Sequence, residues 1–215
     1  MNREKKSDVT SIKLMSDGPF VIKNAFLLVD SNDQPLMLKK KVLALCRCGN
    51  SANKPFCDGT HAKIGFSGSR TTNKSIDKAK AYKGKSITIH DNRRICAHVG
   101  ECLRRLPAVF DKKRRPWIDA DGAETEQIID AIKNCPSGAL SYTIDGVYTP
   151  NMSDEVIIKL ARNGPIEVIG PVALDASLSP PPPNKSCFTL CRCGASENKP
   201  YCDGSHLQLR FRSGK

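Results

Sequence analysis

Alternation of apolar and polar positions predicts short strands near both ends of the chain. Residues 20–29 and 166–174 are rich in β-branched side chains that alternate along the segment. A turn follows each segment, and then a second short strand, at residues 42–45 and 188–190. Each pair of strands predicts a small antiparallel β structure.

The middle of the chain has a different pattern. Residues 86–90 and 139–144 alternate as strands do, whereas residues 124–134 place Ile128, Ile129 and Ile132 on one face of a helix. The predicted order is strand, helix, loop, helix, strand. Residues 67–85 are small, polar and rich in lysine, which predicts a solvated linker ahead of this segment.

A sixteen-residue stretch occurs twice. The sequence CRCGNSANKPFCDGTH, from Cys46 to His61, returns as CRCGASENKPYCDGSH, from Cys191 to His206, and twelve of the sixteen positions are identical. Both copies keep the spacing C-x-C-x8-C-x3-H. The repeat reaches back to Gly18 and Gly164, so that the proline-rich residues 177–186 fall inside the second copy and are expected to be a loop between two strands.

Three thiols and one imidazole supply four ligands, which suits a tetrahedral zinc site or an iron–sulfur cluster. Zinc sites usually separate paired cysteines by two to four residues, whereas one residue separates them here. The last cysteine and the histidine of each copy stand four residues apart. This spacing predicts one face of a helix that starts near the preceding proline, Pro55 or Pro200.

At these residues both copies resemble the CDGSH iron–sulfur domain, also called the NEET family, which carries a [2Fe-2S] cluster. The resemblance implies that the C-x-C pair holds one iron and that the later cysteine and histidine hold the other. Thr60 replaces the name-giving serine in the first copy, and both residues offer a hydroxyl. The implied ligands are Cys46, Cys48, Cys57 and His61 in the first copy and Cys191, Cys193, Cys202 and His206 in the second.

The histidine ligand has two expected consequences. A neutral imidazole leaves the cluster less negative than a fourth thiolate would, which should make its reduction easier. A protonated imidazole cannot hold iron. We therefore expect redox state, pH and cluster retention to be coupled at both copies.

Three further cysteines lie between the copies. Cys96, Cys102 and Cys135, the last followed by proline, match the first, third and distal positions of the bacterial ferredoxin pattern, and Val99 stands at the second position. This segment resembles the divergent single-cluster ferredoxin-like domains that accompany CDGSH modules in some bacterial proteins. The resemblance implies a [3Fe-4S] cluster on the three cysteines, or a [4Fe-4S] cluster with His98 as the fourth ligand. The alternative is three reduced cysteines in a small core.

Cys187 aligns with Val42 of the first copy, an apolar position, and is expected to serve core packing.

Composition and charge indicate the cellular compartment and the kind of partner. The N-terminal eighteen residues lack an apolar segment, and no apolar run reaches the ~20 residues of a membrane span, so we expect a reducing, cytoplasmic setting. There, ten cysteines indicate metal sites rather than disulfides. The net charge of +12 allows an acidic redox partner or cluster acceptor protein. The candidate residues for contact with such a partner are Arg104, Arg105, Lys112, Lys113, Arg114 and Arg115. The alternative is that these residues form an ordinary solvated surface.

Together these patterns predict an α+β protein in which two small β-rich CDGSH modules pack as an intrachain pseudo-dimer of a monomeric chain, with an inserted ferredoxin-like domain. The expected divisions are residues 1–66, a linker at 67–85, 86–148 and 149–215. The predicted function is electron transfer or cluster carriage, not enzyme catalysis, because the sequence has no recognisable catalytic constellation. The alternative is a zinc-stabilised scaffold or nucleic-acid-binding protein, although no aromatic residues interleave the basic ones as stacking on bases would require.

Overall fold

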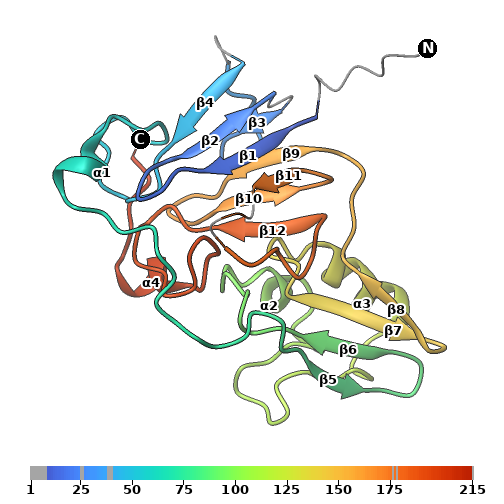
Figure 1. Cartoon of the computed structure of the whole chain (residues 1–215). Helices are drawn as coiled ribbons and strands as arrows, with labels where there is room; N and C mark the ends of the chain where they lie inside the picture. Colours follow the sequence, from blue (N-terminus) through green and yellow to red (C-terminus); the bar gives the residue numbers. More distant parts are fainter. Residues whose placement is uncertain (1–8, 25–26, 38–40, 176, 178, 215) are drawn as a thin grey trace, which may run out of the picture.

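The computed structural model describes residues 9–24, 27–37, 41–175, 177 and 179–214. Within these residues the protein is rich in β structure, with three four-stranded sheets and four short helices (Figure 1). This agrees with the predicted α+β class. No helix in the same residues is long and apolar enough to cross a membrane.

Two of the sheets are built alike, and each takes one strand from the other half of the chain. The first sheet has the order β11-β1-β2-β4, with β1 at Ser11–Leu14, β2 at Phe20–Lys23, β4 at Val42–Leu45 and β11 at Ala173–Asp175. The second has the order β12-β10-β9-β3, with β9 at Ile157–Leu160, β10 at Ile166–Ile169, β12 at Cys187–Leu190 and β3 at Leu28–Val29. The exchanged strands β11 and β3 pair in parallel with β1 and β9, respectively.

The strand exchange corrects the sequence interpretation. Residues 20–29 and 166–174 were each expected to form one segment of strand, but each contains two strands that join different sheets. The break falls at Asn24 and Gly170, whose φ angles of 51° and 84° lie in the left-handed region and end β2 and β10. The chain then crosses to the other half of the molecule. Strands β1 and β9 were not predicted.

The third sheet belongs to the middle segment and has the order β5-β6-β7-β8. Its strands are antiparallel: β5 at Lys80–Lys83, β6 at Thr88–Asp91, β7 at Leu140–Ile144 and β8 at Val147–Pro150. Helices α2, Glu101–Arg105, and α3, Thr125–Lys133, lie between β6 and β7 in the chain, as the predicted order requires. Strand β5 lies within residues 67–85, so the end of the expected linker is instead part of this sheet. Its Tyr82 packs edge-on against Trp117, with ring centroids 6.5 Å apart.

Helix α3 forms where its apolar pattern predicts. The Gln127 side chain accepts a hydrogen bond from the Glu124 N–H at 3.2 Å, which satisfies a free donor at the helix start. Ile128 and Ile132 are fully buried. They belong to one continuous apolar core that also contains Phe20 of the first sheet and Val168 of the second. This core holds the middle segment against the two related sheets.

Candidate metal centres

The repeated stretch folds into the same loop twice. The backbone N–H groups of Cys46 and Cys191 each donate to a proline carbonyl, Pro55 or Pro200, at 2.8 Å. In each loop a buried serine hydroxyl then donates to the residue before the third cysteine, at 2.6 Å for Ser51 to Phe56 and 2.7 Å for Ser196 to Tyr201. The identical residues of the two copies therefore specify one loop geometry.

The candidate ligands of each loop stand in two pairs. The Sγ atoms of the C-x-C cysteines are 3.8 Å apart in the first copy (Cys46 and Cys48) and 3.6 Å in the second (Cys191 and Cys193). The later cysteine Sγ lies close to the histidine Nδ1, at 3.3 Å between Cys57 and His61 and at 3.4 Å between Cys202 and His206. Each loop thus offers two separate pairs of donor atoms.

This pairing can be compared with the metal groups that the loops were expected to hold. A single zinc ion needs four donors that converge at about 2.0–2.3 Å from one point. Among the described residues, no three His, Cys, Asp or Glu side chains are grouped closely enough to hold one ion. A two-iron cluster instead takes two donors on each iron, which is the arrangement that the pairs provide.

The short helices begin later than the sequence predicted. Helices α1, Thr60–Lys63, and α4, Ser205–Gln208, start after the left-handed residues Gly59 and Gly204, so that the histidine of each loop lies on the helix and the third cysteine precedes it. The chain is still extended at the third cysteine because the residue before it forms a β-bridge, Phe56 with Leu45 and Tyr201 with Leu190.

The two loops touch each other through their glycines. A Cβ atom added at Gly49 would lie 2.4 Å from the carbonyl oxygen of Cys193, and one added at Gly194 would lie 2.5 Å from that of Cys48. The contact is reciprocal, and only glycine leaves room for it. Figure 1 shows the two related sheets together in one half of the molecule, with β11 of the second copy paired with β1 of the first.

Two buried arginines interact electrostatically with cysteines of the opposite loop. Burial lowers the pKa of Arg47, and the Cys191 thiolate of the other copy opposes that shift. In the same way burial lowers the pKa of Arg192 to about 10, against the opposing effect of Cys46. Each guanidinium donates to backbone carbonyls of its own half, Arg47 to Gly68 and Arg192 to Gly164, both at 2.7 Å. Positive charge is therefore fixed beside the thiols of both copies.

The pKa values of the second C-x-C pair are shifted in opposite directions. A hydrogen bond from Cys193 lowers the pKa of Cys191 to about 6, while the same contact raises that of Cys193. Burial raises the pKa of Cys202, and it lowers that of His206. The thiolate and the neutral imidazole are the forms that bind metal.

The three middle cysteines lie within electrostatic reach of one another. Burial raises the pKa of Cys102 to about 11, and the thiolates of Cys135 and Cys96 raise it further. Burial also raises the pKa of Cys96, again with a contribution from Cys135. Arg93 Nη1 lies 3.6 Å from the Cys96 Sγ and opposes both shifts. Each of the three thiols is therefore within electrostatic range of the other two, and Arg93 lies beside that of Cys96.

His98 and Val99, the remaining residues of interest in that loop, have different surroundings. The Val99 carbonyl accepts a hydrogen bond from Arg104 at 3.0 Å. The His98 ring lies against the second CDGSH loop, since a Cβ atom added at Gly204 would lie 2.5 Å from its Cδ2. A ligand role for His98 stays a prediction.

Cys187 is buried, as expected for a packing residue, but its position was not foreseen. Its Sγ lies 3.3 Å from the carbonyl oxygens of both Cys135 and Pro136. It thus joins β12 of the second copy to the Cys135 loop of the middle segment. The expectation of burial rested on alignment with the apolar Val42, which is itself 49% exposed, and the alignment gave no signal of this contact.

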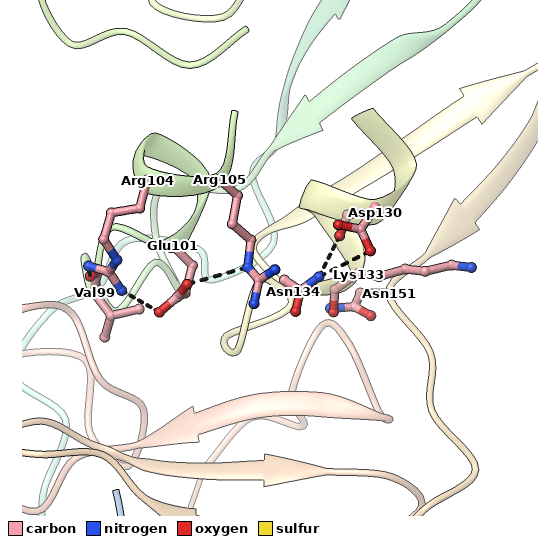
Figure 2. Close-up of polar contacts among 8 residues, drawn as sticks. All are labelled: Val99, Glu101, Arg104, Arg105, Asp130, Lys133, Asn134 and Asn151. Carbon is pink, nitrogen blue, oxygen red and sulfur yellow. Dashed lines mark hydrogen bonds and ion pairs between the residues drawn. The ribbon is translucent and has the colours of Figure 1, made fainter. Parts of the chain in front are cut away.

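A cleft of about 710 Å³ opens beside the Cys135 loop. Figure 2 shows the Glu101 carboxylate between Arg104 and Arg105 of α2, with Asn134 at the end of α3 nearby. The two arginines form ion pairs with Glu101 and line the cleft together with Lys133. The other residues predicted to contact a partner lie elsewhere. Arg114 lines a different hollow, beside Tyr82, and Lys112, Lys113 and Arg115 are exposed.

Glu167 of β10 lines the same cleft and carries a testable pH dependence. Burial raises the pKa of Glu167 from 4.5 to about 7, against the opposing effect of Lys159. A raised folded-state pKa contributes stability that is complete below about pH 4.5 and is lost as pH rises through about 7. We expect Glu167→Gln to match the wild type at pH 5 and to be more stable at pH 8, by about 2–3 kcal/mol.

Thermal unfolding at the two pH values, with Glu197→Gln as an exposed control, checks this expectation. A variant that gains nothing at pH 8 would contradict it.

Comparisons with known proteins agree with this geometry. The model of the iron-binding zinc finger CDGSH type matches residues 17–62 and again residues 163–207, and the model of the divergent 4Fe-4S mono-cluster matches residues 82–145. The chain belongs to the CDGSH family. It is a tandem member, an iron–sulfur protein with a divergent 4Fe-4S domain between its two CDGSH copies.

One relative adds to this assignment. Uncharacterized protein YjdI of Escherichia coli strain K12 is 40% identical over 63 residues, which cover 29% of this chain and 83% of the relative. Uncharacterized protein YjdI of E. coli O157:H7 matches to the same extent. No solved structure matches significantly.

Proposed function

We propose that the protein is an electron carrier with three iron–sulfur sites. Each CDGSH copy holds a [2Fe-2S] cluster on three cysteines and one histidine, and the middle domain holds a third cluster. When bound, such clusters supply one-electron redox centres. The observation that carries the proposal is the division of the donors in each loop into two pairs, at 3.6–3.8 Å and 3.3–3.4 Å.

The residues around the donors have supporting roles. Arg47 and Arg192 place buried positive charge beside thiols of the opposite copy, which favours thiolates there. The sheets remove the C-x-C cysteines from water, since Cys46 and Cys191 are only 3% and 2% exposed. Burial and fixed charge are two of the means by which proteins set the potential of a cluster.

The two copies act as an intrachain pseudo-dimer in this proposal. Support comes from the reciprocal exchange of β3 and β11 and from the matching contacts of Gly49 and Gly194. Each sheet is completed by the other half, so neither half has its full set of strands alone. A monomeric chain could then carry both clusters.

We assign the third cluster to Cys96, Cys102 and Cys135. Three thiolates complete a [3Fe-4S] cluster, whereas a [4Fe-4S] cluster needs a further ligand at its fourth iron. Support comes from the mutual effects of the three thiols on one another and from the matched 4Fe-4S family.

The proposed partner is an acidic redox protein, and the role is that of a carrier rather than an enzyme. The net charge of +12 and the cations that line the cleft beside Cys135 support this choice, because complementary charge steers association. Delivery of a cluster to an acceptor protein is a second candidate. The partial exposure of Cys57 and His61 favours it, since an acceptor must reach the ligands that it displaces.

Metal analysis tests the proposal against the zinc alternative. Protein purified without oxygen is expected to be red-brown, to absorb visible light and to contain iron and sulfide in excess of zinc. A zinc site would be colourless, so a preparation with zinc alone would refute the iron–sulfur assignment. The iron count per chain would also report whether the middle site is filled.

A further inference from the structure

The two CDGSH loops are alike inside but have unequal surroundings. In the second copy Cys202 is 2% exposed and His206 is 4% exposed. The matching residues of the first copy, Cys57 and His61, are partly exposed. Since the hydrogen bonds within the loops agree to 0.1 Å at the prolines and serines, the loops themselves do not cause the difference.

The cause is the middle domain, which packs on one loop. Asn198 of the second copy donates to the Arg94 carbonyl at 2.8 Å and accepts from Arg70 Nε at 2.9 Å. Its counterpart in the first copy, Asn53, is exposed. The segment that follows Arg94 contains Cys96, which lies near enough to Cys202 for their charges to interact.

His98 is at the centre of this contact. A Cβ atom added at Gly204, between Cys202 and His206, would lie 2.5 Å from the His98 Cδ2. The equivalent Gly59 has nearly the same φ, 86° against 87°, but an added Cβ there would have no atom of the described residues within 4 Å. The His98 imidazole therefore lies over the Cys202 and His206 pair of the second copy, whereas the matching pair of the first copy, Cys57 and His61, has no such cover at Gly59.

We propose that the two CDGSH sites have different roles: the copy with Cys57 and His61 exchanges with external partners, and the copy with Cys202 and His206 is enclosed by the middle domain through His98. This inference rests on the proposed iron–sulfur function. The external partner must bring its own iron ligands or redox group to Cys57 and His61. A soluble iron chelator is a suitable probe of that access.

Whole-chain variants that retain one CDGSH copy test the difference. Cys202→Ala keeps the first copy and Cys57→Ala keeps the second, and the middle domain is present in both. With a chelator in excess, iron should leave the first copy about tenfold faster or more, because release from the second requires local opening of its contact with the middle domain. Visible absorption and the coloured chelate follow the release.

His98→Asn isolates the covering residue, since asparagine tolerates the φ of 56° at this position. It should speed release severalfold in the Cys57→Ala background and have no effect in the Cys202→Ala background. If His98 acted only as a ligand of the middle cluster, His98→Asn would change the rate of iron release equally in both backgrounds. Gly204→Ala should also speed release from the second copy, while the matched Gly59→Ala lacks a neighbour to displace.

Equal release from the two copies, or equal effects of His98→Asn in the two backgrounds, would overturn the unequal roles. Absence of iron from the wild-type chain would instead overturn the proposed function itself, so the two failures are distinguishable.

Discussion

Replacement of Gly49 by alanine is expected to remove iron from both CDGSH copies at once. The added Cβ would meet the Cys193 carbonyl oxygen at 2.4 Å, and that backbone has little freedom to move. Cys193 is a proposed ligand of the second copy, and Cys48, next to Gly49, is one of the first. Displacing the contact therefore disturbs both C-x-C pairs. We expect a loss of stability of about 3 kcal/mol or more, from strain and overpacking combined.

Gly146 provides a matched control for this substitution. It has the same φ as Gly49, 79°, but it lies in the turn between β7 and β8, where no atom in the described part of the chain is within 4 Å of an added Cβ. Gly146→Ala should cost only the conformational strain of about 1–2 kcal/mol and should leave the iron content unchanged. Gly194→Ala should behave as Gly49→Ala does, since its Cβ would meet the Cys48 carbonyl.

Iron per chain and the midpoint of thermal unfolding measure both effects. If Gly49→Ala retained all its iron and lost no more stability than Gly146→Ala, the two loops would not depend on each other. If iron were lost from one copy alone, the contact would matter only locally.

The sequence identified the candidate ligands because their spacing is strict. Two copies of C-x-C-x8-C-x3-H supply the donors, and the structure brings each set together as two pairs. Local alternation also located most of the longer strands and α3. These features depend on neighbours in the chain, which a sequence pattern records directly.

Features that depend on distant residues were missed. Alternation identifies a strand but not its partner, so the exchange of β3 and β11 had no signal, and β3 has only two residues. The helix starts were misplaced because Pro55 and Pro200 precede a β-bridge rather than a helix. The contact between His98 and Gly204 arises from two segments about a hundred residues apart, and each looks ordinary alone.

Introduction of a fourth cysteine at Val99 is expected to change the middle cluster. Val99 stands at the second position of the C-x2-C-x2-C run, three residues from Cys96 and from Cys102. Three cysteines leave one corner of a four-iron cluster without a thiolate, and that iron is the easiest to lose. We expect the wild type, after mild oxidation, to show the electron paramagnetic resonance signal of a three-iron cluster. Val99→Cys should lose that signal and gain about one iron per chain.

Val99→Ala is the control, since it shortens the same side chain without adding a thiol. The backbone of the loop should be kept in both variants, because the Val99 carbonyl, not its side chain, accepts the hydrogen bond from Arg104. An unchanged iron count in Val99→Cys, with no three-iron signal in the wild type, would mean that the fourth iron already has a ligand. His98, one residue away, would then be the first residue to replace, and its contact with Gly204 would have to be compatible with that role.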